Sequence, residues 1–253
     1  MIGLASSARL CLNGISTAAG EGIVFHDKND LEKARLSMVE RQLAQRGITD
    51  QRVLQAMRDV PRHRFVPQDL WDMAYRDTPL SIGHEQTISQ PYIVGYMTQM
   101  LHLSQDHRVL EVGTGSGYQA AVLSRLAKQV YTIERVPDLA QRAEQILQEL
   151  GYANIQIRIG DGGYGWPEAA PFDAIIVTAA APKVPPPLIA QLAEAASLIA
   201  PIGRAGYQEL VRVTKHGDCT QVEHLVPVAF VPLVGEHGWR ERDPSAGGND
   251  IFR

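Results

Sequence analysis

The stretch RVLEVGTGSGYQAA, residues 108–121, decides the fold of this chain. Its first residues, RVLEV, form a mostly apolar run that predicts a buried parallel strand, and the segment YQAAVLSRLA predicts a helix. Between them stand three glycines at alternate positions, Gly113, Gly115 and Gly117. A glycine loop between a strand and a helix lets backbone N–H groups approach a ligand closely. The stretch therefore predicts a nucleotide-type site, with a structural glycine turn as the alternative.

The glycine spacing separates two kinds of nucleotide site. A dinucleotide loop has the order G-x-G-x-x-G, and Tyr118 stands where its third glycine would fall. The order here is acid-x-G-x-G-x-G, with Glu111 at the end of the strand. A carboxylate suits a cation, such as the ammonium of an amino-acid-like ligand, better than a pyrophosphate. The spacing therefore disfavours a nicotinamide dehydrogenase.

The chain beyond the loop alternates strands and helices. Strands are predicted at QVYTIER, NIQIRIG and FDAIIVTAAAP, followed by a helix LIAQLAEAA and a strand SLIAPIG. The later segments ELVRVTKHG and VEHLVPVAFVPLVG alternate apolar and polar residues, which predicts antiparallel strands. The expected fold is α/β, a doubly wound, mostly parallel Rossmann-like sheet with antiparallel C-terminal strands. In such a sheet the ligand lies at the carboxyl ends of the strands.

Two acids follow predicted strands at that edge. Glu134 lies 23 residues after Glu111, near the offset of about 20 residues at which an acid meets ribose hydroxyls. Asp161, before Gly162, can accept a hydrogen bond from an adenine amino group. The alternatives are a solvated acid at Glu134 and an ordinary Asp-Gly turn at Asp161.

The segment before the glycine loop predicts a helical cap. We expect helices over 30–45 and 50–60, the second capped by Thr49, then a helix after Pro67, a polar loop and a helix from Pro91. The loop is either surface filler or a lid. The expected organisation is an extension over 1–28, one domain over 29–240 and a disordered tail over 241–253. That domain divides into cap and substrate loop, 29–104, and cofactor-binding core, 105–240.

The composition disfavours several function classes. The chain has 24 basic and 28 acidic residues without a basic block, which argues against a nucleic-acid partner. Cys11 and Cys219 are far apart, which favours a reducing compartment, and no run is long enough to span a membrane. We therefore expect a cytoplasmic protein without a membrane partner. The nearest metal candidate is the group His216, Asp218, Cys219 and His224, and we expect no metal there.

Six motifs in order give the chain a family resemblance. They are RHRFVP (62–67), GHEQTISQP (83–91), EVGTGSGYQ (111–119), GDGGYGW (160–166), APFDAIIVTAAAP (170–182) and FVPLVG (230–235). With these motifs the chain resembles the protein-L-isoaspartate O-methyltransferases. The resemblance implies transfer of a methyl group from S-adenosylmethionine to the α-carboxylate of L-isoaspartyl residues in damaged proteins. The ester then cyclises to a succinimide, part of which opens to aspartate.

The resemblance also implies roles for residues. The TIS loop would lie over the methyl donor, with the Ser89 hydroxyl orienting the substrate carboxylate and Thr87, Ile88 and Thr178 near the substrate. A competing interpretation makes Ser89 the cap of the helix at Pro91. The expected cofactor-binding residues are Glu111, Gly113, Gly115, Gly117, Glu134, Asp161 and Gly162. A small-molecule carboxyl or O-methyltransferase, and an inactive cofactor-binding homologue, remain alternatives.

Two departures from the family pattern stand out. Glu85 occupies the place of a usual glycine, which adds a negative charge close to where an anionic substrate is expected. Ala195 and Ala196 replace a usual Gly-Gly turn, which is expected to lengthen the preceding helix.

Overall fold

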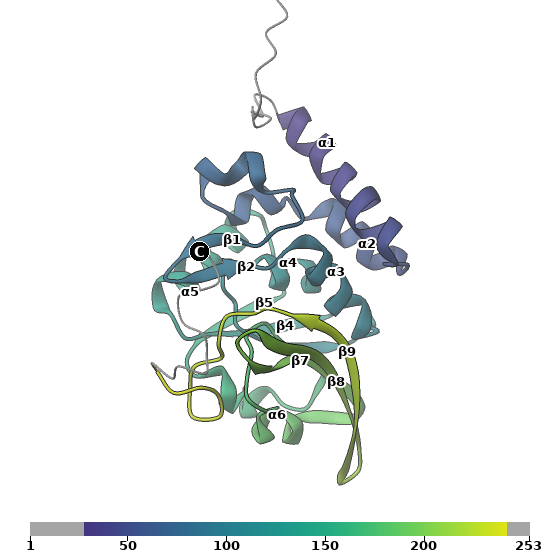
Figure 1. Ribbon diagram of the computed structural model, residues 1–253, viewed down its shortest axis with the longest axis vertical. Coiled ribbons are helices and arrows are strands. Elements are labelled where there is room, and N and C mark those ends of the chain that lie inside the picture. Colours follow the sequence, from purple (N-terminus) through teal and green to yellow (C-terminus); the bar gives the residue numbers. More distant parts are fainter. Residues whose placement is uncertain (1–27, 242–253) are drawn as a thin grey trace, which may run out of the picture.

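The computed structural model of the protein describes residues 28–241. The expected extension over 1–28 and tail over 241–253 thus lie outside the described residues, apart from Lys28 and Glu241. Within this range, a seven-stranded sheet lies among helices, with a separate two-stranded hairpin above it (Figure 1).

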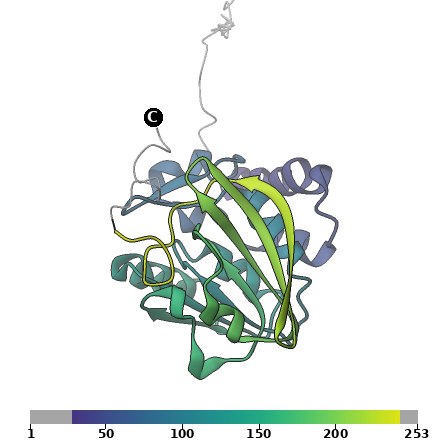
Figure 2. The same ribbon diagram turned by 60° about the horizontal axis from the view of Figure 1, so that its bottom comes forward.

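The sheet has the strand order β5-β4-β3-β6-β7-β8-β9. Strands β5 to β7 in this order are parallel, and β8 and β9 continue the sheet in antiparallel pairing. Figure 2 shows the long strands β7, β8 and β9 side by side at one end. The strands are β3 (Arg108–Val112), β4 (Gln129–Glu134), β5 (Ile155–Ile159), β6 (Phe172–Val177), β7 (Leu192–Arg204), β8 (Tyr207–His216) and β9 (Cys219–Val228). The predicted fold class is confirmed.

Apolar residues on both faces of the central strands explain the layered fold. Val109 of β3 belongs to one buried cluster and the adjacent Leu110 to the other, because successive side chains of a strand point to opposite faces. Helices α1 to α5 contribute to the first cluster and α6 to the second (Figure 1). The helices are α1 (Lys28–Met38), α2 (Gln51–Asp59), α3 (Pro91–Met100), α4 (Tyr118–Ser124), α5 (Pro137–Glu149) and α6 (Pro186–Ala190).

Two of three local predictions about helices are wrong. Asp50, not Thr49, caps α2, because its carboxylate accepts from the backbone N–H of Arg52 at 2.9 Å. The helix expected after Pro67 is present, as the 3₁₀ helix Gln68–Met73. The segment LIAQLAEAA is helical only as far as Ala190, because β7 begins at Leu192 and pairs with Phe172.

Ala195 also contradicts the expected helix extension. It lies within β7 at a φ of 58°, where the register between β6 and β7 shifts. Ala195 therefore keeps the left-handed backbone that a glycine adopts without cost, and the alanine pair lengthens the strand instead of the helix. Glu85 also has a left-handed backbone, with a φ of 57°.

We expect Ala195→Gly to raise the free energy of unfolding by up to about 1 kcal/mol, because the left-handed conformation strains a residue with a Cβ. Glu85→Gly is expected to act in the same direction. Denaturant unfolding measures both. Ala193→Gly is the matched control in β7, where φ is not positive, and it should destabilise by about 0.5–1 kcal/mol. Equal destabilisation by Ala193→Gly and Ala195→Gly would contradict this reading.

The polar segment expected to be a loop is a β-hairpin. Its strands are β1 (Leu80–Gly83) and β2 (Gln86–Ile88), joined by His84 and Glu85 with positive φ. Leu80, Ile82 and Ile88 are buried. The expectation of a loop fails because these apolar residues alternate with polar ones and bury one face of the hairpin.

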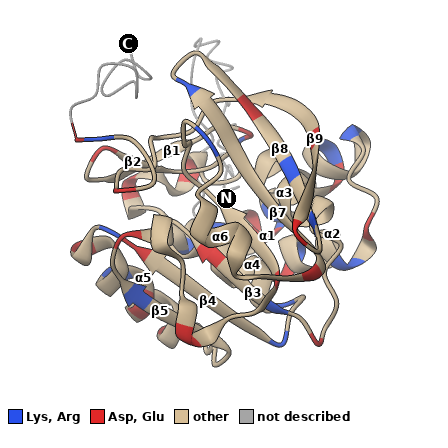
Figure 3. Ribbon diagram, turned by 90° about the horizontal axis from the view of Figure 1, so that it is seen from below, with Lys and Arg blue, Asp and Glu red and all other residues tan. Residues whose placement is uncertain are grey.

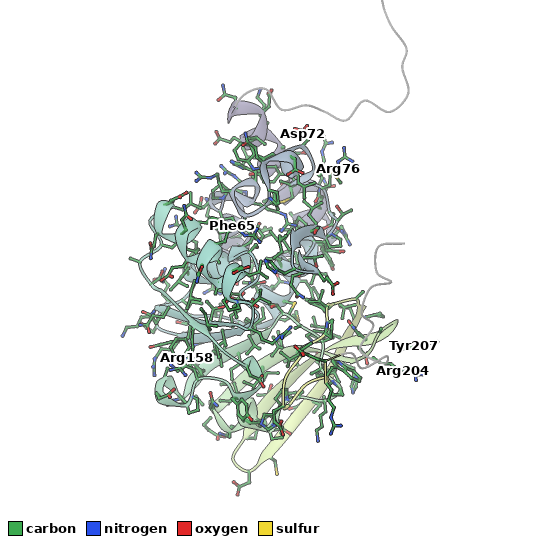
Figure 4. The ribbon with its side chains drawn as sticks, turned by 90° about the vertical axis from the view of Figure 1, so that its left-hand side faces the viewer. Phe65, Asp72, Arg76, Arg158, Arg204 and Tyr207 are labelled. Carbon is green, nitrogen blue, oxygen red and sulfur yellow. The ribbon has the colours of Figure 1, made fainter. Side chains whose placement is uncertain are left out.

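Charges are spread over the molecule. Acidic and basic segments are interspersed in Figure 3. Figure 4 shows Asp72 and Arg76 in the helical layer, away from Arg204 and Tyr207 on the sheet. Among the described residues, none of the helices has the length and apolar character that crossing a membrane requires.

Candidate active site

The main pocket lies at the carboxyl ends of β3, β4 and β6, where parallel α/β sheets bind ligands. Besides Val94, Met97, Tyr118, Gln119 and Gly162, five segments line it: the hairpin end, the glycine loop, the end of β4, the end of β6 and a strap from the C-terminal part. These are residues 86–89, 112–116, 133–136, 178–179 and 231–234. The strand ends predicted to meet therefore meet, and the hairpin and strap close the pocket around them.

The glycine loop is fitted against the end of β6. Gly113 has a φ of 99°, and a Cβ built on it would lie 2.4 Å from the Thr178 hydroxyl. That hydroxyl donates to Gly113 O at 2.7 Å and lies 3.0 Å from Val112 O. Only glycine fits this position, so the bare backbone of Gly113 and Gly115 faces the pocket. Gly117 lies outside the pocket, and a Cβ on it would contact Ala143 of α5 at 3.2 Å.

Glu134 joins the glycine loop to β4. Its carboxylate accepts from the N–H groups of Gly115 at 2.7 Å and Val136 at 2.9 Å. The side chain lines the pocket and is almost buried. Glu134 therefore holds the loop in shape and also presents negative charge to a ligand.

Glu111, expected beside the ammonium of a ligand, is not among the pocket-lining residues. It lies in β3, is fully buried and accepts from the Thr132 hydroxyl at 2.6 Å, while its Oε1 has no partner among the described residues. Burial raises the pKa of Glu111 from its ordinary value of 4.5 to about 8. The acid is therefore mainly protonated at neutral pH in this structure.

Glu111→Gln should make stability less dependent on pH. Between pH 4.5 and about 8 the carboxyl is ionised in the unfolded chain and protonated in the folded one, so folding takes up a proton. This contribution is present below pH 4.5 and is lost as the pH rises through about 8. The free energy of unfolding of the variant, relative to the unsubstituted protein, should rise by up to about 1.4 kcal/mol per pH unit across this window. Denaturant titrations at several pH values test this, and parallel pH profiles would exclude it.

Asp161 and Gly162 follow β5. The Asp161 carboxylate accepts from Gly163 N and Glu236 N, both at 2.8 Å, and so fastens the C-terminal strap. Gly162 lines the pocket, and a Cβ on it would lie 2.4 Å from Val112 Cγ1. Asp161 itself is not among the pocket-lining residues.

Ser89 lies where two cavities meet. It lines the main pocket and a neighbouring cleft, and Thr87 and Thr178 are shared in the same way. The helix α3 has no side-chain cap from its N-cap residue, and Asp77 instead accepts from Tyr92 N at 2.9 Å. The capping role considered for Ser89 is thus taken by Asp77. Among the described residues the Ser89 hydroxyl has no hydrogen-bond partner, so it is available to a ligand.

The neighbouring cleft is made by neutral residues. Besides Thr87, Ser89 and Thr178, it is lined by Pro79, Gln90, Ile93 and residues 227–231. Ile88 lines only the main pocket and is buried opposite Leu80. An anion bound beside Ser89 would meet hydroxyl groups and no fixed carboxylate in this cleft.

Sequence reasoning gave no site role to the strap at residues 231–234. Its backbone is held by Ala180 N, which donates to Val231 O at 2.8 Å, and by Leu233 N, which donates to Ala180 O at 2.7 Å. The motif FVPLVG was the available signal, but its alternation suggested only a strand. Within the described residues, no group of three or more His, Cys, Asp or Glu side chains is arranged to hold a metal.

The fold and the pocket define a Rossmann-like methyltransferase. Two solved structures support this class. One is a protein-L-isoaspartate O-methyltransferase, with a TM-score of 0.73 and 28% identity, and the match covers 82% of this chain and 67% of the other. The second is a beta-aspartate methyltransferase (PCMT) from Plasmodium falciparum in complex with S-adenosyl-L-homocysteine, with a TM-score of 0.70 and 29% identity, and the match covers 79% of this chain and 98% of the other.

The chain belongs to the protein-L-isoaspartate(D-aspartate) O-methyltransferase family, whose sequence model matches residues 33–238. It is 56% identical over 210 residues to protein-L-isoaspartate O-methyltransferase 1 of Syntrophobacter fumaroxidans, covering 83% of this chain and 98% of the relative. It is 52% identical over 230 residues to the protein-L-isoaspartate O-methyltransferase of Opitutus terrae, covering 90% of this chain and 98% of the relative.

Proposed function

We propose that this protein transfers a methyl group from S-adenosylmethionine to the α-carboxylate of L-isoaspartyl residues in damaged proteins and peptides. The ester then closes to a succinimide, and part of it reopens to aspartate. The observation that carries the proposal is the Ser89 hydroxyl, which has no hydrogen-bond partner among residues 28–241 and lies at the junction of the main pocket and the neutral cleft. Family membership of nearly the whole described chain supports the same reaction.

The residues of the main pocket fit the cofactor. Gly113 and Gly115 line the pocket with bare backbone, a Cβ on Gly113 would meet the Thr178 hydroxyl at 2.4 Å, and Glu134 suits a ribose. We propose Gly113, Gly115, Glu134 and Gly162 as cofactor-binding residues, with Glu111, Gly117 and Asp161 supporting the shape of the site from beneath or beside it. When bound, the cofactor supplies a methyl group on a positively charged sulfur.

The chain needs no general base for this reaction. A carboxylate with a pKa of about 4 is already ionised at neutral pH. Ser89 donates a hydrogen bond that orients this carboxylate, while Thr87 and Ile88 shape the wall beside it. The Thr178 hydroxyl donates to the glycine-loop backbone, so Thr178 acts mainly on the shape of the substrate side. Orientation of two bound groups can supply effective molarities of about 10⁵–10⁸ M.

Exclusion of water should add to the rate. The reacting charges neutralise one another, so a site poor in water favours the transition state over the separated charges. The buried side chains of Ile88, Val94 and Met97 line the pocket and supply such surroundings.

A methyl-transfer assay with radiolabelled cofactor tests the proposed function. We expect label in a peptide containing one isoaspartyl residue and none above background in the same peptide with aspartate. Equal labelling of both peptides would contradict the substrate assignment. Absence of label, together with binding of S-adenosylhomocysteine, would instead indicate an inactive homologue, and label only in small carboxylic acids would indicate the small-molecule alternative.

We further propose that residues 29–240 act as one domain in the cytoplasm, without nucleic acid or membrane as a partner and without a metal. The even mixture of charges and the free, exposed Cys219 support this proposal.

A further inference from the structure

The hairpin that leads to Ser89 is held by α5. Within the described part of the chain, strands β1 and β2 pair only with each other, and they lie beside α5 (Figure 1). Arg142 of α5 donates from Nη2 to the Ile82 carbonyl of β1. A second contact joins His84 Nε2 and Asp138 Oδ2 at 3.4 Å, but both side chains are exposed, so this contact contributes little.

A β-bulge explains why Arg142 contacts the hairpin at Ile82. The register pairs Ser81 with Thr87 and Gly83 with Gln86, which leaves Ile82 as the extra residue. A bulged residue lacks its own partner in the ladder, and bulges are common beside active sites because they redirect side chains. Here Arg142 provides the partner for the free backbone group of Ile82.

The bulge directs the Ile82 side chain onto the glycine loop. Ile82 is 1% exposed, and a Cβ built on Gly115 would lie 3.5 Å from Ile82 Cδ1. The hairpin therefore covers the loop that faces the cofactor. Its second strand ends at Ile88, so the position of Ser89 follows the position of the hairpin.

The contact with Ile82 is the hydrogen bond that Arg142 makes among the described residues. Among residues 28–241 it has no carboxylate within ion-pair distance, and its hydrogen bond goes to the Ile82 carbonyl. Its helix follows Glu134, Arg135 and Val136, all of which line the pocket. The acid at the ribose side thus ends β4, and the donor that holds the hairpin lies on α5, which begins three residues later.

We propose that Arg142 is a positioning residue: it keeps the hairpin closed on the glycine loop, and so retains the cofactor and places Ser89 beside the acceptor. The part concerning the acceptor rests on the proposed function. The part concerning the hairpin and the cofactor does not.

The test compares Arg142→Ala, Arg142→Lys and the control Gln145→Ala. Gln145 is exposed on the same helix and bonds only Glu149 among the described residues, at 2.9 Å. Three measurements are made on each protein: hydrogen exchange of the amides in residues 80–88, the dissociation rate of S-adenosylhomocysteine, and kcat and KM for an isoaspartyl peptide.

For Arg142→Ala we expect faster hydrogen exchange in the hairpin. The dissociation rate of S-adenosylhomocysteine should rise about tenfold, because one hydrogen bond from a charged donor is lost. The kcat should fall by a similar factor. Arg142→Lys should recover most of each effect, because an ammonium also donates to a carbonyl, and Gln145→Ala should change none of them.

The inference is overturned if Arg142→Ala, while folded, leaves hairpin exchange and the dissociation rate at the values of Gln145→Ala. It is also overturned if Arg142→Lys shows the same changes in exchange, dissociation and kcat as Arg142→Ala and both variants have lowered melting temperatures, since that result indicates a general loss of stability. Failure of the proposed function would appear differently, as absence of isoaspartyl methylation in the unsubstituted protein.

Discussion

Replacing Ser89 by alanine is expected to slow methyl transfer to an isoaspartyl peptide by about 10- to 100-fold, the contribution of one hydrogen bond to a charged group. The affinity for S-adenosylhomocysteine should change by less than about twofold, because Ser89 is expected to contact the acceptor and not the cofactor. The structure supports this separation. Asp77 provides the cap of α3, so removal of the Ser89 hydroxyl leaves that helix intact.

Ser81→Ala is the matched control. Ser81 lies in the same hairpin, opposite Thr87, and is exposed outside the pocket. Single-turnover rates give the transfer step, and calorimetry gives the affinity. A parallel loss of rate and affinity in Ser89→Ala would mean that the hairpin has collapsed, and a rate equal to that of Ser81→Ala would remove Ser89 from the mechanism.

Glu134→Ala is expected to have the opposite profile. The affinity for S-adenosylhomocysteine should fall on the order of 100-fold, because two backbone N–H groups lose a charged acceptor and the ribose loses its partner. The N–H groups concerned belong to Gly115 in the glycine loop and to Val136 just after β4. With saturating cofactor, methyl transfer should be much less affected.

Two variants sharpen the second prediction. Glu134→Gln keeps the shape but loses the charge, so its affinity should lie between those of Glu134→Ala and the unsubstituted protein. Glu144→Ala removes an exposed acid on α5 outside the main pocket and should leave the affinity unchanged. Calorimetry that finds normal affinity in Glu134→Ala would exclude Glu134 as a cofactor-binding residue.

The predicted core follows from residues that act locally. The glycine stretch and the apolar strands specify the parallel sheet, since apolar runs of that length are stable only when both faces are covered. For the same reason Gly113, Glu134, Asp161 and Thr178 could be assigned to one edge before any contact was known, although Asp161 itself does not line the pocket. The six motifs could indicate the family because they extend across nearly the entire domain.

Other features depend on distant partners. Asp77 displaces Ser89 as the cap of α3, and the backbone bond to Phe172 fixes the start of β7. Neither contact is visible in local sequence, because each joins segments separated along the chain. Ala195 is a similar case, since only pairing with β6 imposes its left-handed backbone.

By itself, the sequence determined the sheet, the edge that binds the ligand and the residue types that meet there, because hydrophobic periodicity and glycine spacing act within a few residues. Only the tertiary structure decided that Glu111 is buried and protonated, that Asp161 fastens the strap, and that a bulged hairpin held by Arg142 carries Ser89 to the pocket. These properties arise from burial and from hydrogen bonds between remote segments, which exist only once the chain has folded.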